Sequence, residues 1–226
     1  MISVIHPSRG RWGQAEKTAY KWARSADTEI EYLLVVEPDQ RVFYTPCLME
    51  LHGKMDGCQM LFENNNKSAI EAINYGASQT TGNIIVVISD DFDCPHHWDT
   101  LLLEAIGNKT DFCAKTNDGH QDWLITLPIM DRKYYERFGY VYNPNYAHMF
   151  ADLEMTSVAW MLGRYIELPL TFKHNHYSLT GQQPDAINRK NNATWGQGQM
   201  LFKRRMAQNF GIDPVQGLPD LKQHFV

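Results

Sequence analysis

Residues 84–93, Ile84-Ile85-Val86-Val87-Ile88-Ser89-Asp90-Asp91-Phe92-Asp93, decide the fold and indicate where a site would lie. The opening β-branched run predicts a strand buried on both faces, as in a parallel sheet. Three aspartates follow it within four positions. Carboxylates this close repel one another unless something compensates their charge. Because open α/β sheets bind ligands at the carboxyl ends of their strands, the stretch predicts a Mg²⁺ or Mn²⁺ site that holds a diphosphate.

The residues before this stretch predict parallel α/β structure. A strand over residues 2–5, a helix over 14–24 and a strand over 32–36 make a βαβ unit. Residues 59–62 suit a short third strand. Ser68 and Glu71 have capping-box spacing, which predicts a helix starting at Ser68.

The residues after this stretch predict a helix over 98–106 and then a more variable half. Its expected elements are strands over 112–115 and 124–127, helices over 131–138 and 156–162, strands over 166–168 and 171–176, and a helix over 192–209. No linker separates the halves, so residues 1–226 are expected to form one domain, with a nucleotide-binding half (1–114) and an acceptor-binding half (115–226).

Composition limits the class of protein. The chain has 226 residues, 43% of them hydrophobic, enough for one substantial core. No apolar run is long enough for a transmembrane segment, and the N-terminus lacks the features of a signal peptide, so a cytoplasmic protein is expected. The four cysteines show no C-x-x-C spacing. A formal charge of −5 argues against a general nucleic-acid surface.

The order of these motifs resembles a known family. A first strand ends in Pro7-Ser8-Arg9, a second ends in Glu37, Asn74 and Gly76 lie in a helix, and the acidic cluster follows. This arrangement is similar to the nucleotide-sugar-dependent glycosyltransferases of the GT-A fold, family-2 branch. The resemblance covers roughly the first 110 residues well and the rest loosely. It implies a mostly parallel, Rossmann-like central sheet flanked by helices.

The resemblance implies a donor site in the first half. Pro7, Ser8 and Arg9 would line the nucleoside pocket, and Glu37 would contact the base or ribose. Lys67 would lie near the nucleotide. Asp91 and Asp93 would form a metal-binding D-x-D. In an extended chain these two would share a face and Asp90 would lie on the other side, which permits one or two of the acids to reach a metal and another to hold a ribose or orient a water. The extra aspartate leaves the register of the motif open, and a solvated acidic turn is the alternative.

Two further roles in the second half follow from the resemblance. A general base is expected near Asp152 and Glu154; family members often have adjacent Glu-Asp here, whereas this chain has Ala151-Asp152. Asp152 is preferred as the base. The alternative is that Asp152 is the N-cap of a helix and Glu154 is an acid in its first turn that favours the helix dipole. His174 or His176 would complete the metal shell, with His174 preferred.

Together these patterns predict a metal-dependent glycosyltransferase. It would move a sugar from a nucleotide-diphosphate donor, a UDP-sugar first, to an acceptor hydroxyl, and the resemblance implies an inverting displacement. The acceptor could be a glycan, a small molecule or a modified nucleic-acid base. A nucleotidyltransferase is one alternative, although residues 6–11 suit a triphosphate-binding loop poorly. A catalytically inactive nucleotide- or sugar-binding module is the other.

Overall fold

A seven-stranded mixed sheet forms the centre of the protein in a computed structural model that describes residues 1–45, 58–62 and 68–218. The strand order is β3-β2-β1-β4-β6-β5-β7. Strands β1 to β4 run parallel, β6 is antiparallel to β4 and β5, and β7 is parallel to β5. The strands are β1 (Ile2–Pro7), β2 (Ile30–Val36), β3 (Cys58–Phe62), β4 (Ile84–Val87), β5 (Cys113–Asn117), β6 (Ile129–Asp131) and β7 (Tyr165–Thr171). The predicted βαβ unit and the parallel first half are confirmed.

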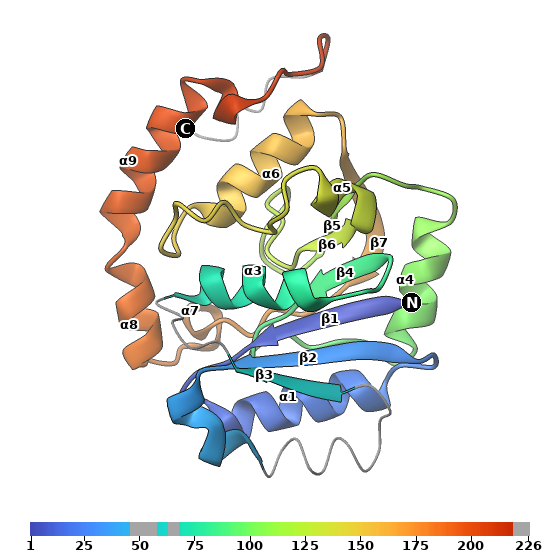
Figure 1. Cartoon of the computed structure of the whole chain (residues 1–226), viewed down its shortest axis with the longest axis vertical. Helices are drawn as coiled ribbons and strands as arrows, with labels where there is room; N and C mark the ends of the chain where they lie inside the picture. Colours follow the sequence, from blue (N-terminus) through green and yellow to red (C-terminus); the bar gives the residue numbers. More distant parts are fainter. Residues whose placement is uncertain (46–57, 63–67, 219–226) are drawn as a thin grey trace.

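Helices cover both faces of the sheet (Figure 1). On β4, Ile84 and Val86 pack with α1 and α4, whereas Ile85 and Val87 pack with α3, α5, α6 and α9. The strand before the acidic cluster is therefore buried on both sides, as its sequence predicts. The helices are α1 (Trp12–Arg24), α3 (Ala69–Gln79), α4 (Trp98–Ile106), α5 (Arg132–Glu136), α6 (Ala151–Met161), α7 (Tyr177–Thr180), α8 (Ala186–Asn192) and α9 (Trp195–Met206), with 3₁₀ turns η1 (Pro38–Gln40) and η2 (Asn209–Gly211).

Helix α3 is fixed by its first residues and by one glycine. The Ser68 hydroxyl accepts a hydrogen bond from the Glu71 backbone N–H at 3.3 Å, so the predicted N-cap is confirmed. At Gly76, a Cβ atom would lie 2.7 Å from Ile5 Cγ2 and 2.8 Å from Val35 Cγ2. The glycine thus lets α3 lie directly on β1 and β2, beside the ends of these strands.

Several elements of the second half differ from the sequence expectation. Residues 124–127 are not a strand; Ile129–Asp131 forms β6 instead, because it is this segment that pairs with β4 and β5. Strand β7 continues through Pro169, which is tolerated because β7 is the last strand of the sheet. Beyond it, His174 makes only an isolated bridge to Phe92. The helix expected over 192–209 is the shorter helix α9, which a separate helix, α8, precedes; α6 begins earlier than expected, at Ala151.

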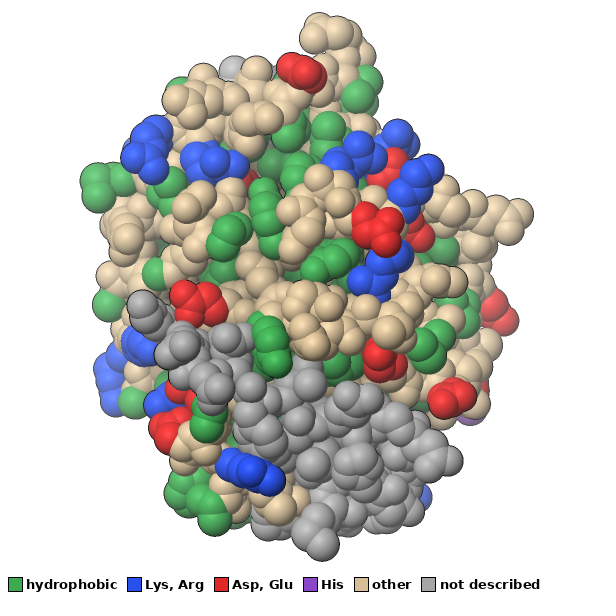
Figure 2. All heavy atoms as spheres, viewed as in Figure 1, with side chains coloured by type: hydrophobic (Ala, Val, Ile, Leu, Met, Phe, Trp, Pro, Cys, Tyr) green, Lys and Arg blue, Asp and Glu red, His purple; other side chains and the backbone are tan. Residues whose placement is uncertain are grey.

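Helices α8 and α9 run along the side of the molecule where β1 and β2 end (Figure 1). None of the helices in the described part of the chain combines the length and apolar character that crossing a bilayer requires. On the face drawn in Figure 2, the described Lys and Arg side chains are interspersed with Asp and Glu.

Candidate active site

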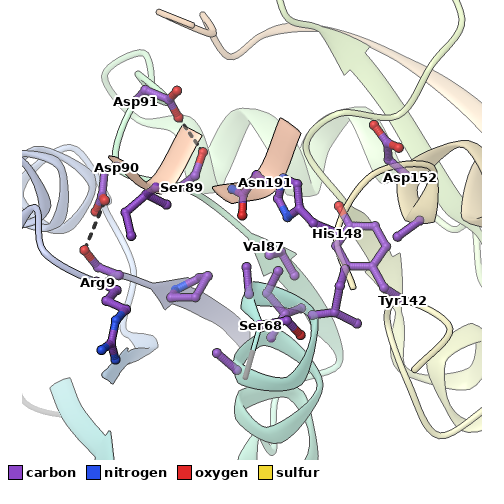
Figure 3. A pocket seen from close by; sticks show the side chains of 18 of the residues that line it. Arg9, Ser68, Val87, Ser89, Asp90, Asp91, Tyr142, His148, Asp152 and Asn191 are labelled. Carbon is purple, nitrogen blue, oxygen red and sulfur yellow. Dashed lines mark hydrogen bonds between the residues drawn. The ribbon is translucent and has the colours of Figure 1, made fainter. Parts of the chain in front are cut away.

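A cleft of about 420 Å³ lies at the carboxyl ends of the parallel strands (Figure 3). Its walls come from the ends of β1, β2 and β4, the first turns of α3 and α6, and one side of α8. Most of the residues that the sequence singles out line it: Pro7, Ser8, Arg9, Glu37, Asp90, Asp91, Asp152, His174 and His176. Lys67 falls outside the described residues. The cleft has the position and the size expected of a small-molecule site.

Asp90 holds the strand ends together. Its buried carboxylate lies 2.9 Å from His6 Nε2 and accepts a hydrogen bond from the Ser8 hydroxyl at 3.0 Å. Its backbone carbonyl accepts a further bond from the Thr18 hydroxyl at 2.6 Å. Both carboxylate oxygens are thus engaged by β1 and the residue after it. Asp90 forms part of the cleft wall and fixes the end of β4 against β1 and α1.

Asp91 lines the cleft beside Ser89 and His174. The Ser89 hydroxyl donates to Asp91 Oδ1 at 2.5 Å, and His174 Nε2 lies 3.4 Å from Oδ2. Burial raises the pKa of the Asp91 carboxyl, but the hydrogen bond and charge of His174 and the bond from Ser89 outweigh burial and lower the pKa to about 2. Asp91 is therefore ionised at neutral pH beside an imidazole. This pair could supply two ligands of a divalent cation.

Asp93 lies in a different environment from Asp91. A turn closes at this point, with the Phe92 N–H bonded to the Ser89 carbonyl at 3.2 Å, so the side chains do not alternate as in an extended strand. The Asp93 carboxylate forms an ion pair with Lys21 of α1 and is not part of the cleft wall. Its role as a metal ligand stays a prediction. Over residues 1–45, 58–62 and 68–218, no three His, Cys, Asp or Glu side chains are grouped so that they could hold a metal.

The donor set at Asp91 and His174 nevertheless fits a divalent cation that takes its other ligands from the substrate. Mg²⁺ in particular is commonly bound by one or two carboxylates together with phosphate oxygens and waters. Two protein ligands at the cleft surface are consistent with such a site. Phe92 stacks on the His174 ring with centroids 4.2 Å apart, which fixes the imidazole beside Asp91.

The loop after β1 and the end of β2 form one end of the cleft. Arg9 forms ion pairs with Glu37 and, at 3.1 Å, with Asp39. The Ser8 hydroxyl lies 2.9 Å from the Tyr44 hydroxyl. The expected nucleoside-pocket residues are therefore brought together, with their polar groups oriented by one another.

Asp152 and Glu154 lie in the first turn of α6 but meet different surroundings. Asp152 is partly buried, lines the cleft, and has its pKa raised by burial, an effect that a backbone N–H bond from Leu153 reduces. Glu154 is buried and points away from the cleft. It forms an ion pair with Arg205 of α9 at 2.7 Å. Neither acid is the N-cap of α6, a position that Phe150 occupies with a φ of 74°.

Among the cleft residues that the sequence did not single out are Arg11, Tyr142, His148 and Asn191. Arg11 donates two bonds to Asp185, the N-cap of α8, at 2.7 and 2.9 Å, and so joins the first loop to α8. The sequence places Arg11 in the same loop as Ser8 and Arg9, and this position is a signal that could identify it as a cleft residue. The other three carry no recognisable local signal.

Comparison with known proteins shows similarity in structure only. No protein-family model matches the sequence, and no curated protein matches it significantly. Among solved structures, a mannosyltransferase from Pyrobaculum calidifontis, PcManGT in complex with GDP-Man and Mn²⁺, aligns with a TM-score of 0.60 and 17% identity, over 76% of this chain and 56% of that chain. S. aureus TarS, residues 1–349 in complex with UDP, aligns with a TM-score of 0.57 and 15% identity, over 76% and 59% of the two chains.

The chain thus spans less than two thirds of the length of these structures. The shared part is the mixed sheet with its flanking helices, and the identities of 17% and 15% establish the fold and nothing finer. The protein has the GT-A-like fold of nucleotide-sugar glycosyltransferases, as its motif order predicts.

Proposed function

We propose that this protein is a divalent-cation-dependent glycosyltransferase that moves a sugar from a nucleoside-diphosphate donor, a UDP-sugar first, to an acceptor hydroxyl. One observation carries the proposal: a single cleft at the carboxyl ends of the strands has the ionised Asp91 at one end and Asp152, with its raised pKa, at another. These are the two groups that such a transfer needs, one for the departing diphosphate and one for the attacking hydroxyl.

The donor would bind through the first half of the chain. Pro7, Ser8, Arg9 and Glu37 would surround the nucleoside, and Asp90 would keep their loop in place through Ser8 and His6. Asp91 and His174 would hold the cation, with Asp93 as a further ligand only if it leaves Lys21. When bound, the cation would act as a Lewis acid on the negative charge that grows on the leaving diphosphate.

Asp152 would act on the acceptor. A raised pKa makes the ionised carboxylate a stronger base, which suits removal of the proton from an attacking hydroxyl. A base opposite the leaving group supports a direct displacement that inverts the anomeric centre. Glu154 is the weaker candidate because Arg205, Asn143 and Tyr146 already engage both of its oxygens. The acceptor would enter from the half that residues 115–226 form.

Donor hydrolysis tests this proposal. Release of the nucleotide is measured across a panel of UDP- and GDP-sugars, with and without Mn²⁺, for the wild type and for Asp91→Asn. We expect Mn²⁺-dependent release that Asp91→Asn abolishes, because the substitution removes the negative charge of a cation ligand while keeping the shape of the side chain.

Two outcomes would count against it. Near-normal release by Asp91→Asn would remove the cation site, and Mn²⁺-dependent UDP binding without any turnover would identify a binding module instead. Asp93→Asn separates the two versions of the site: a loss as large as that of Asp91→Asn would mean that Asp93 exchanges Lys21 for the cation.

A further inference from the structure

His148 has a buried nitrogen that no other group satisfies. The residue lies in the segment that leads into α6, and its side chain lines the cleft. Its Nδ1 is the single buried side-chain nitrogen or oxygen without a hydrogen-bond partner in the described part of the chain. A buried polar atom of this kind is costly, so it calls for an explanation.

The backbone next to His148 is held by contacts with α9 and the residue before it. The next residue, Met149, donates its N–H to the Thr194 hydroxyl at 3.2 Å. Helix α9 lies directly on this segment, since a Cβ on Gly198 would come within 2.3 Å of the Met149 carbonyl oxygen. These contacts position the backbone that carries His148 at the cleft wall.

The surroundings of His148 suit a neutral, hydroxylated ligand. Burial lowers the pKa of the His148 imidazole to about 4, so the ring is uncharged at neutral pH and offers no cation to a phosphate. The Tyr142 hydroxyl and the Asn191 amide line the same cleft, and within the described residues neither side chain is hydrogen-bonded to another group. A hydroxyl can donate or accept, so it can pair with Nδ1 in either tautomer of the ring.

Position identifies which hydroxyl this would be. In Figure 3, His148 lies between the part of the cleft that carries Asp90 and Asp91 and the part that carries Asp152. If the diphosphate is held at Asp91 and the acceptor at Asp152, the transferred sugar occupies the space between them.

We infer that His148 Nδ1 forms a hydrogen bond with a hydroxyl of the transferred sugar and so helps to determine which sugar the protein accepts. This inference rests on the proposed function. It assigns to His148 a specificity role on the glycosyl group, distinct from binding of the nucleotide and from removal of the acceptor proton.

Binding measurements test the inference without an acceptor. The Kd values of UDP and of the preferred UDP-sugar are measured by calorimetry in the presence of Mn²⁺, for the wild type, His148→Phe and His148→Asn. The ratio of the two Kd values isolates the sugar. We expect the advantage of the UDP-sugar over UDP to fall by about 5- to 150-fold in His148→Phe, since a buried polar contact is lost, while the Kd of UDP stays the same. His148→Asn, which keeps a small polar group, replaces His148→Phe in these measurements if the phenylalanine variant does not fold.

Deoxy donors locate the contact. A UDP-sugar that lacks the contacted hydroxyl should bind to the wild type and to His148→Phe with the same Kd. UDP-sugars that lack a different hydroxyl should bind more weakly to His148→Phe than to the wild type. His96→Asn, at an exposed histidine outside the cleft wall, is the matched control and should leave every Kd unchanged.

The possible outcomes distinguish failure of this inference from failure of the proposed glycosyltransferase function. If the wild type binds UDP and UDP-sugars but the ratio is unchanged in both His148 variants, the inference is overturned and the proposed function stands. If the wild type binds no nucleotide or nucleotide sugar, both are overturned.

Discussion

Substitution of Glu154 by glutamine tests whether Glu154 anchors α6 to α9, whereas Asp152 of the same helix lines the cleft. Glu154 Oε1 accepts bonds from Asn143 Nδ2 at 2.8 Å and Arg205 Nε at 2.9 Å, and Oε2 accepts bonds from the Tyr146 hydroxyl and Arg205 Nε, both at 2.7 Å. A glutamine side chain loses the charge and places N–H groups where one of these donors points. The change therefore disrupts the contact between α6, the segment before it, and α9.

The expected cost follows from burial. Removing one partner of a buried ion pair costs about 3–5 kcal/mol, and because Arg205 is partly exposed we expect about 2–4 kcal/mol here. For a chain of this length such a loss lowers the melting temperature by on the order of 10 °C. Glu136→Gln, at an exposed glutamate, is the matched control and should melt like the wild type.

Thermal unfolding and donor turnover at low temperature are measured on the same samples. We expect Glu154→Gln to melt early yet to retain turnover while it is folded, because Glu154 does not line the cleft. A melting temperature within about 2 °C of the wild type would refute the claimed anchoring role. Loss of transfer in a stably folded variant would instead make Glu154 the base.

Three other changes test the site and its support. Asp152→Asn should abolish transfer while donor binding is retained. Burial raises the pKa of Asp152 in the folded state, so the ionised carboxylate opposes folding and the variant should be at least as stable as the wild type at neutral pH. This difference in stability should vanish as the pH falls through that pKa and the wild-type carboxyl becomes protonated. In the wild type, the rate of transfer should decline as the pH is lowered, with a midpoint above the pKa of an ordinary carboxyl group. Arg11→Lys should weaken UDP binding. It should lower the free energy of unfolding by about 1 kcal/mol or less, because the ion pair of Arg11 with Asp185 is exposed. Unchanged UDP binding would mean that Arg11 only holds α8. Gly198→Ala should cost about 1–3 kcal/mol through the clash with Met149, whereas Gly196→Ala, where a Cβ meets open space in the same helix, should stabilise, and equal effects would contradict this packing.

Local patterns in the sequence were enough to predict the first half of the fold. The β-branched run before Asp90 favours a doubly buried strand, and Ser68 with Glu71 specifies a helix start through atoms three residues apart. Because β1, β2 and β4 are parallel, their carboxyl ends meet at one edge, which is why Ser8, Glu37 and Asp91 come together as expected.

The second half depends on contacts that no local pattern contains. Residues 124–127 and 129–131 each contain neighbouring apolar residues, and only pairing with β4 decides which segment is the strand. The different surroundings of Asp152 and Glu154 depend partly on Arg205, which lies 51 residues away from Glu154. Likewise, a turn that closes at Phe92, rather than spacing, separates Asp91 from Asp93.

The bond between Arg11 and Asp185 joins residues 174 positions apart and so sets when the cleft can be completed during synthesis. At about 5–20 residues per second, the ribosome reaches Asp185 roughly 10–35 s after Arg11. The loop after β1 is synthesised early, and Asp90 can fix it well before that time, but α8, which borders the other side of the cleft, forms only after Asp185 has been synthesised. A nascent chain stalled in between would expose an open, unfinished cleft, which is the interval in which chaperones would have most to protect.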